Sequence, residues 1–174
     1  INAAKVLAGY GHKKVIHITG PDTYASALYR KNGFIRGAGK NGLEYVILES
    51  KMNFRGGYAL AEQVKELVKQ QKFTAVFAAN DWMAVGLIQA LRAEEMAVPD
   101  QVSVLSVDNI PLAGQFAPGL TTYSLDAEMM ITEGFMLMDT AEENGGEENF
   151  RRRIILQPVL ITRDTLKKKE GVQQ

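Results

Sequence analysis

The chain of 174 residues contains no cysteine, only two histidines and a single tryptophan. The absence of cysteine excludes disulfide bonds and thiolate chemistry, and it is typical of proteins from a reducing compartment. Twenty basic residues balance twenty acidic ones, so no global field draws the chain to nucleic acid or to an anionic membrane. A nucleic-acid site would therefore have to be local.

Long apolar runs are also missing. No stretch of the sequence approaches the roughly 18 consecutive apolar residues that a membrane-spanning helix needs. The first residues, 1–4, show neither the charged nor the apolar region of a signal peptide. We therefore predict a cytoplasmic protein that makes no contact with a membrane.

Short apolar runs, in contrast, alternate with helical patterns through the first two-thirds of the chain. Each run ends in polar residues just before a predicted helix, and the runs cover residues 15–20, 45–48, 75–79 and 102–107. Continuous Val, Ile and Leu are typical of parallel strands that are covered on both faces. Strands separated by helices form right-handed βαβ units. We predict an α/β fold with a doubly wound parallel sheet, whose ligand site lies at the carboxyl ends of the strands.

The spacing of apolar residues and the glycines at segment ends predict the helices. The predicted helices cover residues 3–10, 26–39, 55–71, 82–95 and 126–143. After Asp108 the alternation stops, and the pattern predicts a loop at 111–119, a strand at 120–125, an acidic glycine-rich turn at 142–149, and a strand at 154–162 that Pro158 interrupts. These last strands need not belong to the first sheet. We expect the tail after residue 166 to be frayed.

Three groups of polar residues at the strand ends have both a structural and a binding interpretation. Asn80 and Asp81 are both favourable N-caps, and if one caps the helix the other is free to face a cleft. Asp108 either forms an Asx turn with Asn109 or binds a ligand. Arg30 is either a solvated surface residue or a clamp for vicinal hydroxyls or a carboxylate.

Motifs for catalysis and for metal binding are missing. His12 lies in a predicted turn and His17 inside a predicted strand, and we expect both to be structural. No spacing of histidine and carboxylate indicates a metal site, and there is no Gly-x-Ser-x-Gly elbow. We therefore predict no catalytic residue, no metal and no cofactor. An enzymatic function would rest on the fold alone.

An ordered set of motifs resembles the effector-binding region of the lactose-repressor (LacI/GalR) family. The resemblance covers nearly the whole chain, up to about residue 166. The most specific blocks are Ala79-Asn80-Asp81-Trp82-Met83-Ala84, Val98-Pro99-Asp100-Gln101-Val102-Ser103-Val104 and Pro118-Gly119-Leu120-Thr121-Thr122. Weaker matches are segment 3–21, Arg30 before Gly33-Phe34, and Gly57-Tyr58 at the opening of a helix.

This resemblance implies a periplasmic-binding-protein-like fold of two α/β lobes, with a small effector in the cleft between them. Residues 1–118 and 159–166 would form a complete C-terminal effector-binding lobe, followed by a tail at 167–174. Residues 119–158 would be crossover strands and a helix that belong to a largely missing N-terminal lobe. Because the family's helix-turn-helix headpiece is also missing, we expect the chain to be partial, and its apolar helix at 126–143 to be poorly ordered or buried against another chain.

Site residues follow from the same resemblance. Arg30 would grip the hydroxyls or a carboxylate of the effector, Asn80 would form a hydrogen bond to it, and Asp108 would accept bonds from paired hydroxyls. Met52 stands where the family usually has an aromatic residue that stacks on a sugar ring or base. Asp22, just after the first strand, completes the predicted ligand-binding set.

We therefore predict the effector-sensing and dimerisation portion of a LacI/GalR-type transcriptional regulator, not an enzyme. The effector would be a sugar or a related polar metabolite, and operator DNA would be bound only through a headpiece that this chain lacks. We predict a homodimer with Phe116, Tyr58 and Trp82 at the interface, although Trp82 could instead supply a stacking surface for the effector. Two alternatives are an exported sugar-binding protein of a transporter and an α/β enzyme that acts on a small polar substrate.

Overall fold

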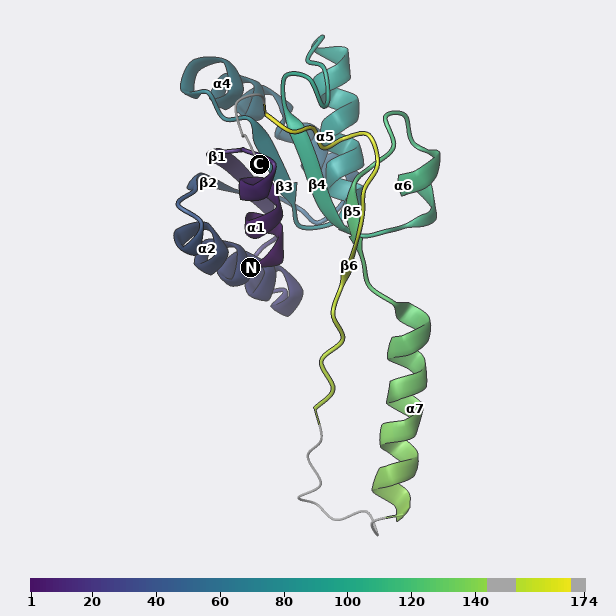
Figure 1. Ribbon diagram of the computed structural model, residues 1–174. Coiled ribbons are helices and arrows are strands. Elements are labelled where there is room, and N and C mark those ends of the chain that lie inside the picture. Colours follow the sequence, from purple (N-terminus) through teal and green to yellow (C-terminus); the bar gives the residue numbers. More distant parts are fainter. Residues whose placement is uncertain (144–152, 170–174) are drawn as a thin grey trace.

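The computed structural model describes residues 1–143 and 153–169. Within them, one sheet has the strand order β2-β1-β3-β4-β5-β6 (Figure 1). Neighbouring strands are parallel except for β6, which is antiparallel to β5 at one edge. The strands are β1 (Lys14–Thr19), β2 (Glu44–Glu49), β3 (Ala75–Ala78), β4 (Ser103–Asp108), β5 (Thr122–Ser124) and β6 (Val159–Ile161). The predicted α/β sheet is thus confirmed, with one antiparallel strand added.

Helices cover both faces of the sheet, because successive side chains of a strand point to opposite faces. Val15 packs in one apolar core with residues of α1 (Asn2–Gly9) and α2 (Ala25–Lys40). Its neighbour Ile16 packs in a second core, on the other face. The helices of that face are α3 (Phe54–Ala59), α4 (Ala61–Gln71) and α5 (Asp81–Ala93).

Three predicted elements differ from the structure. The strand predicted at 154–162 is confined to β6, because residues 153–158 form no strand. The single helix predicted at 55–71 is two helices, α3 and α4, which meet at Leu60. The predicted loop at 111–119 contains a short helix, α6 (Pro111–Gln115), whose proline stands in its first turn. Proline is favourable there because its missing N–H would have no partner inside the helix.

The tail after residue 166 is anchored at its start, so the prediction that it frays is wrong as far as Lys169. Leu166 is buried in the core beneath α1, and the Lys169 amide donates to the carbonyl oxygen of Tyr10 at 2.8 Å. Residues 170–174 lie outside the described part, as does most of the predicted turn at 142–149.

Glycines let α3 and α5 approach at backbone distance. A Cβ on Gly57 would lie 1.9 Å from the carbonyl oxygen of Met83, and one on Gly86 would lie 2.0 Å from that of Phe54. Such contacts are shorter than any side chain allows. The close packing sets the segment before α3 beside the first turn of α5, where the polar strand ends lie.

Beyond residue 118 the chain first joins the sheet and then leaves it. Strand β5 pairs with β4, with Val107 opposite Tyr123. Helix α7 (Ala127–Glu143) then extends away from the sheet beside the returning segment 153–158 (Figure 1). A cavity of about 440 Å³ lies between the two. The lobe boundary at residue 118 stays a prediction.

Several large apolar side chains of α7 are about half exposed: Met129, Met130, Ile131, Phe135, Met136 and Met138. Despite this apolar face, none of the helices in the described residues is long and apolar enough to span a membrane.

Candidate functional site

An ion pair joins two of the three charged residues that we predicted to bind ligand, Arg30 and Asp108. Arg30 of α2 donates from Nη2 to Oδ1 of Asp108, the last residue of β4, at 3.1 Å. Its Nη1 donates to the carbonyl oxygen of Ala79, just after β3, at 2.5 Å. The two charged side chains are 22% and 32% exposed, so solvent still reaches both. Helix α2 and the end of β4 therefore bring Arg30 and Asp108 together, and their binding of a ligand stays a prediction.

The electrostatics of this pair favour hydroxyl groups as partners. Burial raises the pKa of Asp108 above its ordinary value, Arg30 opposes this rise, and the nearby Asp81 adds to it. The pair offers a carboxylate that accepts hydrogen bonds beside a guanidinium that donates them. A hydroxyl both donates and accepts, so two vicinal hydroxyls can satisfy both groups.

Asn80 is the N-cap of α5. Its Oδ1 accepts from the Met83 amide at 2.8 Å, and its Nδ2 donates to the carbonyl oxygen of Met52 at 3.1 Å. Asn80 is only 7% exposed. The capping interpretation is thus confirmed for Asn80, while its hydrogen bond to an effector stays a prediction.

Asp81 is fully buried, so the expectation that it faces a cleft once Asn80 caps the helix is wrong. Its Oδ1 accepts from the hydroxyls of Ser106 at 2.5 Å and Thr122 at 2.6 Å. Its Oδ2 accepts from the Ile110 amide at 2.9 Å. The carboxylate therefore ties α5 to β4, to β5 and to the turn that follows β4.

The two other predicted ligand residues lie at different depths. Met52, which follows β2, packs its side chain over Gly20 at the end of β1, where an added Cβ would lie 2.2 Å from Met52 Cγ. Asp22 forms an ion pair with Lys31 at the surface, and its side chain is half exposed. Met52 thus forms an apolar surface beside the strand ends, and Asp22 lies at the exposed margin of this edge of the sheet.

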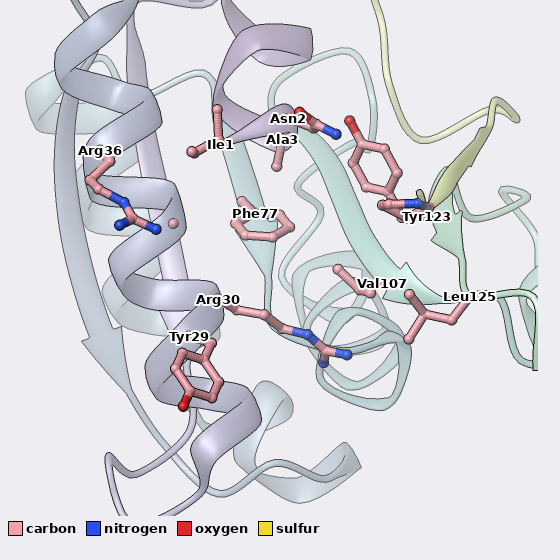
Figure 2. A pocket seen from close by; sticks show the side chains of 12 residues that line it. Ile1, Asn2, Ala3, Tyr29, Arg30, Arg36, Phe77, Val107, Tyr123 and Leu125 are labelled. Atoms are coloured by element: carbon pink, nitrogen blue, oxygen red, sulfur yellow. The ribbon is translucent and has the colours of Figure 1, made fainter. Parts of the chain in front are cut away.

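An open cavity of about 360 Å³ lies next to the ion pair, between α2 and the strands. Figure 2 shows Arg30 reaching from α2 toward Val107 and Leu125. Phe77 and Tyr123 contribute aromatic surface to the same lining. The lining combines the guanidinium groups of Arg30 and Arg36 with apolar surface.

Both histidines are buried and structural, as predicted. Burial lowers the pKa of each to about 4, which keeps both imidazoles neutral near pH 7. His17 Nδ1 lies 2.9 Å from the Phe77 carbonyl oxygen, and His12 Nδ1 lies 2.9 Å from Thr74 Oγ1. Across residues 1–143 and 153–169, no group of three or more acidic or histidine side chains could hold a metal ion.

Sequence reasoning missed one residue near the site, Arg163. Its Nη2 donates to Oδ1 of Asn109 at 2.8 Å, and its Nη1 donates to the carbonyl oxygen of Leu120 at 2.7 Å. A lone arginine before Asp164, after a short edge strand, is typical of a solvated position. No local signal could have identified Arg163, because its partners are 43 and 54 residues away.

The predicted interface residues lie on the surface or near it. Tyr58 of α3 is 48% exposed and Trp82 of α5 is 47% exposed. Phe116 is partly buried against the core beneath α3 and α5. Phe54, at the start of α3, stacks on Tyr58 with ring centroids 6.1 Å apart. Whether these residues meet a second copy stays a prediction.

Comparison with known proteins agrees with this geometry. The family model described as periplasmic binding protein-like domain matches residues 4–166. The HTH-type transcriptional repressor PurR of Vibrio cholerae is 32% identical over 168 residues, which are 95% of this chain and 49% of PurR. The chain therefore spans about half the length of such curated relatives, which are transcriptional regulators and not enzymes.

Solved structures show the same fold. The Escherichia coli transcriptional repressor AscG superposes with a TM-score of 0.80 at 30% identity, over 95% of this chain and 60% of AscG. A sugar-binding regulator of the LacI family from Escherichia coli, complexed with phosphate, superposes with a TM-score of 0.83 at 29% identity, over 97% of this chain and 60% of the regulator. The chain belongs to the periplasmic binding protein-like family, in the form that serves LacI/GalR-type transcriptional regulators as their effector-binding domain.

Proposed function

We propose that this domain binds a neutral polyhydroxylated molecule, a sugar or a close relative, at the Arg30–Asp108 pair. The observation that carries the proposal is the ion pair itself, which lies at the strand ends and remains open to solvent. Because the positive charge of Arg30 is already compensated by Asp108, an uncharged ligand can bind without leaving an unpaired charge.

The neighbouring residues support a ligand of this class. Phe77 and Tyr123 give the cavity beside Arg30 apolar surface for a sugar ring, and Met52 and Asn80 lie at the same edge of the sheet. The relative that superposes with a TM-score of 0.83 is itself described as sugar-binding. Asp22 lies at the exposed margin of this edge, where it adds negative charge beside Lys31.

In the full-length protein, this domain would act as a sensor for a part that binds operator DNA. We infer that the effector shifts the population of DNA-binding-competent molecules by favouring one arrangement of two lobes, which couples two separate sites. Residues 119–158 would carry the chain between those lobes.

We also propose that the protein is a homodimer through the face formed by α3 and α5. The exposed aromatic side chains of Tyr58 and Trp82 support this, because aromatic residues are enriched at the centres of protein interfaces. Phe116 borders the same core and would extend the contact. Sedimentation of Tyr58→Glu with Trp82→Glu, beside the unchanged protein, tests whether this face forms the dimer.

Calorimetry on the full-length protein, with ribose, glucose and lactose as probes, tests the binding site. Arg30→Ala and Asp108→Ala should each weaken binding by about 1.5 to 3 kcal/mol, the contribution of a hydrogen bond to a charged group. The matched control is Lys40→Ala, because Lys40 lies on the same helix, is exposed and is not part of the cavity lining. Unchanged affinity in both test variants would remove the site assignment. Binding of none of the three sugars would contradict the proposed ligand class.

A further inference from the structure

The turn that presents Asp108 has an unusual backbone. Asp108 has φ of 123° and Asn109 has φ of 55°, in two consecutive residues that are not glycine. Left-handed conformations are uncommon for residues with a side chain, and they persist where the surroundings hold them. The position of the Asp108 carboxylate therefore depends on whatever fixes this turn.

Contacts from two directions fix it. On one side, the buried Asp81 carboxylate accepts a hydrogen bond from the Ile110 amide. On the other side, the side chain of Asn109 accepts from Arg163 at 2.8 Å and donates from Nδ2 to Ser124 Oγ at 3.4 Å. The side-chain amide of Asn109 is thus engaged at both its oxygen and its nitrogen.

Two further hydrogen bonds hold Arg163 in place. Besides the bond from Nη1 to the Leu120 carbonyl oxygen, its backbone amide donates to Thr121 Oγ1 at 2.9 Å. One guanidinium therefore bridges the segment before β5 and the turn after β4. An arginine can do this because its fork of N–H donors reaches two acceptors at once.

The partners of Asn109 also occupy special places in the chain. Ser124 ends β5, from which the chain continues into α7, and Arg163 follows β6, by which the chain returns (Figure 1). Both segments that connect the sheet to the α7 extension therefore contact the same side-chain amide. A displacement of either segment acts on Asn109, and Asn109 adjoins Asp108.

We propose that Arg163 and Asn109 are positioning residues, which hold Asp108 in place for the ligand and transmit displacements of β5 and β6 to it. The role of Arg163 and Asn109 in ligand binding rests on the proposed function, in which Asp108 binds the ligand. The mechanical part does not, since the contacts of Asn109 with Arg163 and Ser124 are made within the chain itself.

Nuclear magnetic resonance on the ligand-free chain tests the mechanical part. In Arg163→Met, we expect the Cα and Cβ signals of Asp108 and Asn109 to move away from the values of positive φ, and the Ile110 amide to exchange about tenfold faster. Asn109→Ala should give the same result. Asn109→Asp should leave the signals of Asp108 and the exchange of Ile110 near those of the unchanged protein, because a carboxylate still accepts from Arg163.

The matched control is Arg153→Met, at an exposed arginine on the same returning segment. It should leave all these signals in place. The inference is wrong if Arg163→Met changes neither shifts nor exchange, or if Asn109→Asp behaves like Asn109→Ala. Should Arg163→Met fail to fold by circular dichroism, the Asn109 variants decide the question alone.

The transmission of displacements from β6 to Asp108 is tested with a further substitution, Pro158→Ala, immediately before β6. Pro158→Ala should change the chemical shifts of Asp108 when Arg163 is present. It should leave them unchanged in the Arg163→Met variant. Equal changes at Asp108 in both backgrounds, or none in either, would remove the transmission step.

The functional part is measured separately, by calorimetry with ribose, glucose and lactose on the full-length protein. Arg163→Met should weaken the binding of a sugar about tenfold, and Asn109→Asp should retain it. A protein that binds none of the sugars but shows the expected resonance changes would contradict the proposed function and keep the positioning role. Undiminished binding in Arg163→Met would contradict that Arg163 positions Asp108 for the ligand.

Discussion

The sheet and the α7 extension have similar apolar patterns but opposite surroundings. Ile16 and Phe34 are completely buried, whereas Phe135 of α7 is 59% exposed and Met136 is 57% exposed. The strands carry apolar side chains on both faces, and α7 carries a broad apolar stripe. The difference lies in what faces them: helices lie on both faces of the sheet, whereas among the described residues only the segment 153–158 runs beside α7.

This comparison shows that an amphipathic pattern indicates which face is buried but not by which partner. Apolar patches of this kind are typical of contact surfaces. The prediction that α7 is either poorly ordered or buried against another chain therefore stays a prediction. The sheet needs no such partner, because its core is complete within residues 1–124 and 159–166.

The largest difference between the two regions should appear in the free energy of unfolding when a phenyl ring is removed from each. Phe34→Ala should destabilise the chain by about 3 to 5 kcal/mol, because it leaves a cavity beside His17, Tyr45 and Phe77. In the monomeric chain, where Phe135 is exposed, Phe135→Ala should change the free energy of unfolding by less than about 0.5 kcal/mol. Urea unfolding of both variants measures the two effects. A cost of several kcal/mol for Phe135→Ala would show that α7 is buried in solution.

Removing the buried carboxylate should come next in size. Asp81→Ala leaves the hydroxyls of Ser106 and Thr122 and the Ile110 amide without their acceptor. Unpaired buried donors are costly, so we expect a loss of about 2 to 4 kcal/mol in urea unfolding. The control is Asp139→Ala, an exposed acidic residue of α7, which should have almost no effect. An equally small effect of both substitutions would contradict the structural role of Asp81.

The fold's broad plan could be predicted from the sequence, because it depends on local patterns. The apolar composition of the runs at 15–20 and 102–107 predicts buried strands directly, and the glycines at 9 and 11 mark the end of α1. The break at Leu60 could not be predicted in this way. It depends on how closely α3 approaches α5, which the contacts of Gly57 determine across 26 residues of chain.

In the candidate site, too, local patterns predict some residues, and others depend on distant contacts. Arg30 and Asp108 could be identified because strand ends converge in any parallel sheet and because the motifs matched a family. Asp81 and Arg163 could not be assigned correctly, since their partners lie on β4, β5 and the turns beside them. Which of two adjacent polar residues caps a helix and which is buried depends on these distant partners.

Acid should affect the sheet through its two buried imidazoles. Burial holds the pKa of His12 and His17 at about 4 in the folded chain, against an ordinary value of 6.5. Between these values the unfolded chain binds protons that the folded chain does not, so stability is greatest above pH 6.5 and falls as the pH drops toward 4. Each histidine should contribute a loss of about 2 to 3 kcal/mol over this range.

Urea unfolding between pH 7 and pH 4 measures this dependence. His17→Phe should remove about half of it, because a phenyl ring fits beside Phe34 and Phe77 and does not titrate. The described part of α7 contains no histidine, so its helical signal should not follow the same curve. A flat stability profile down to pH 4.5 would show that the imidazoles are protonated in the folded chain.

Helix caps offer the finest comparison of the two regions. Asn53 caps α3 by accepting from the Gly56 amide at 2.9 Å, and Asp126 accepts from the Met129 amide at 2.9 Å at the start of α7. Each cap should stabilise its helix by about 1 kcal/mol. Since α3 packs into the core, Asn53→Ala should lower the global free energy of unfolding by that amount. Since no layer of the described residues faces α7, Asp126→Ala should instead speed amide exchange in the first turn of α7 and leave the global free energy of unfolding unchanged. Equal global losses in the two variants would show that α7 unfolds together with the sheet and that the two regions form one cooperative unit.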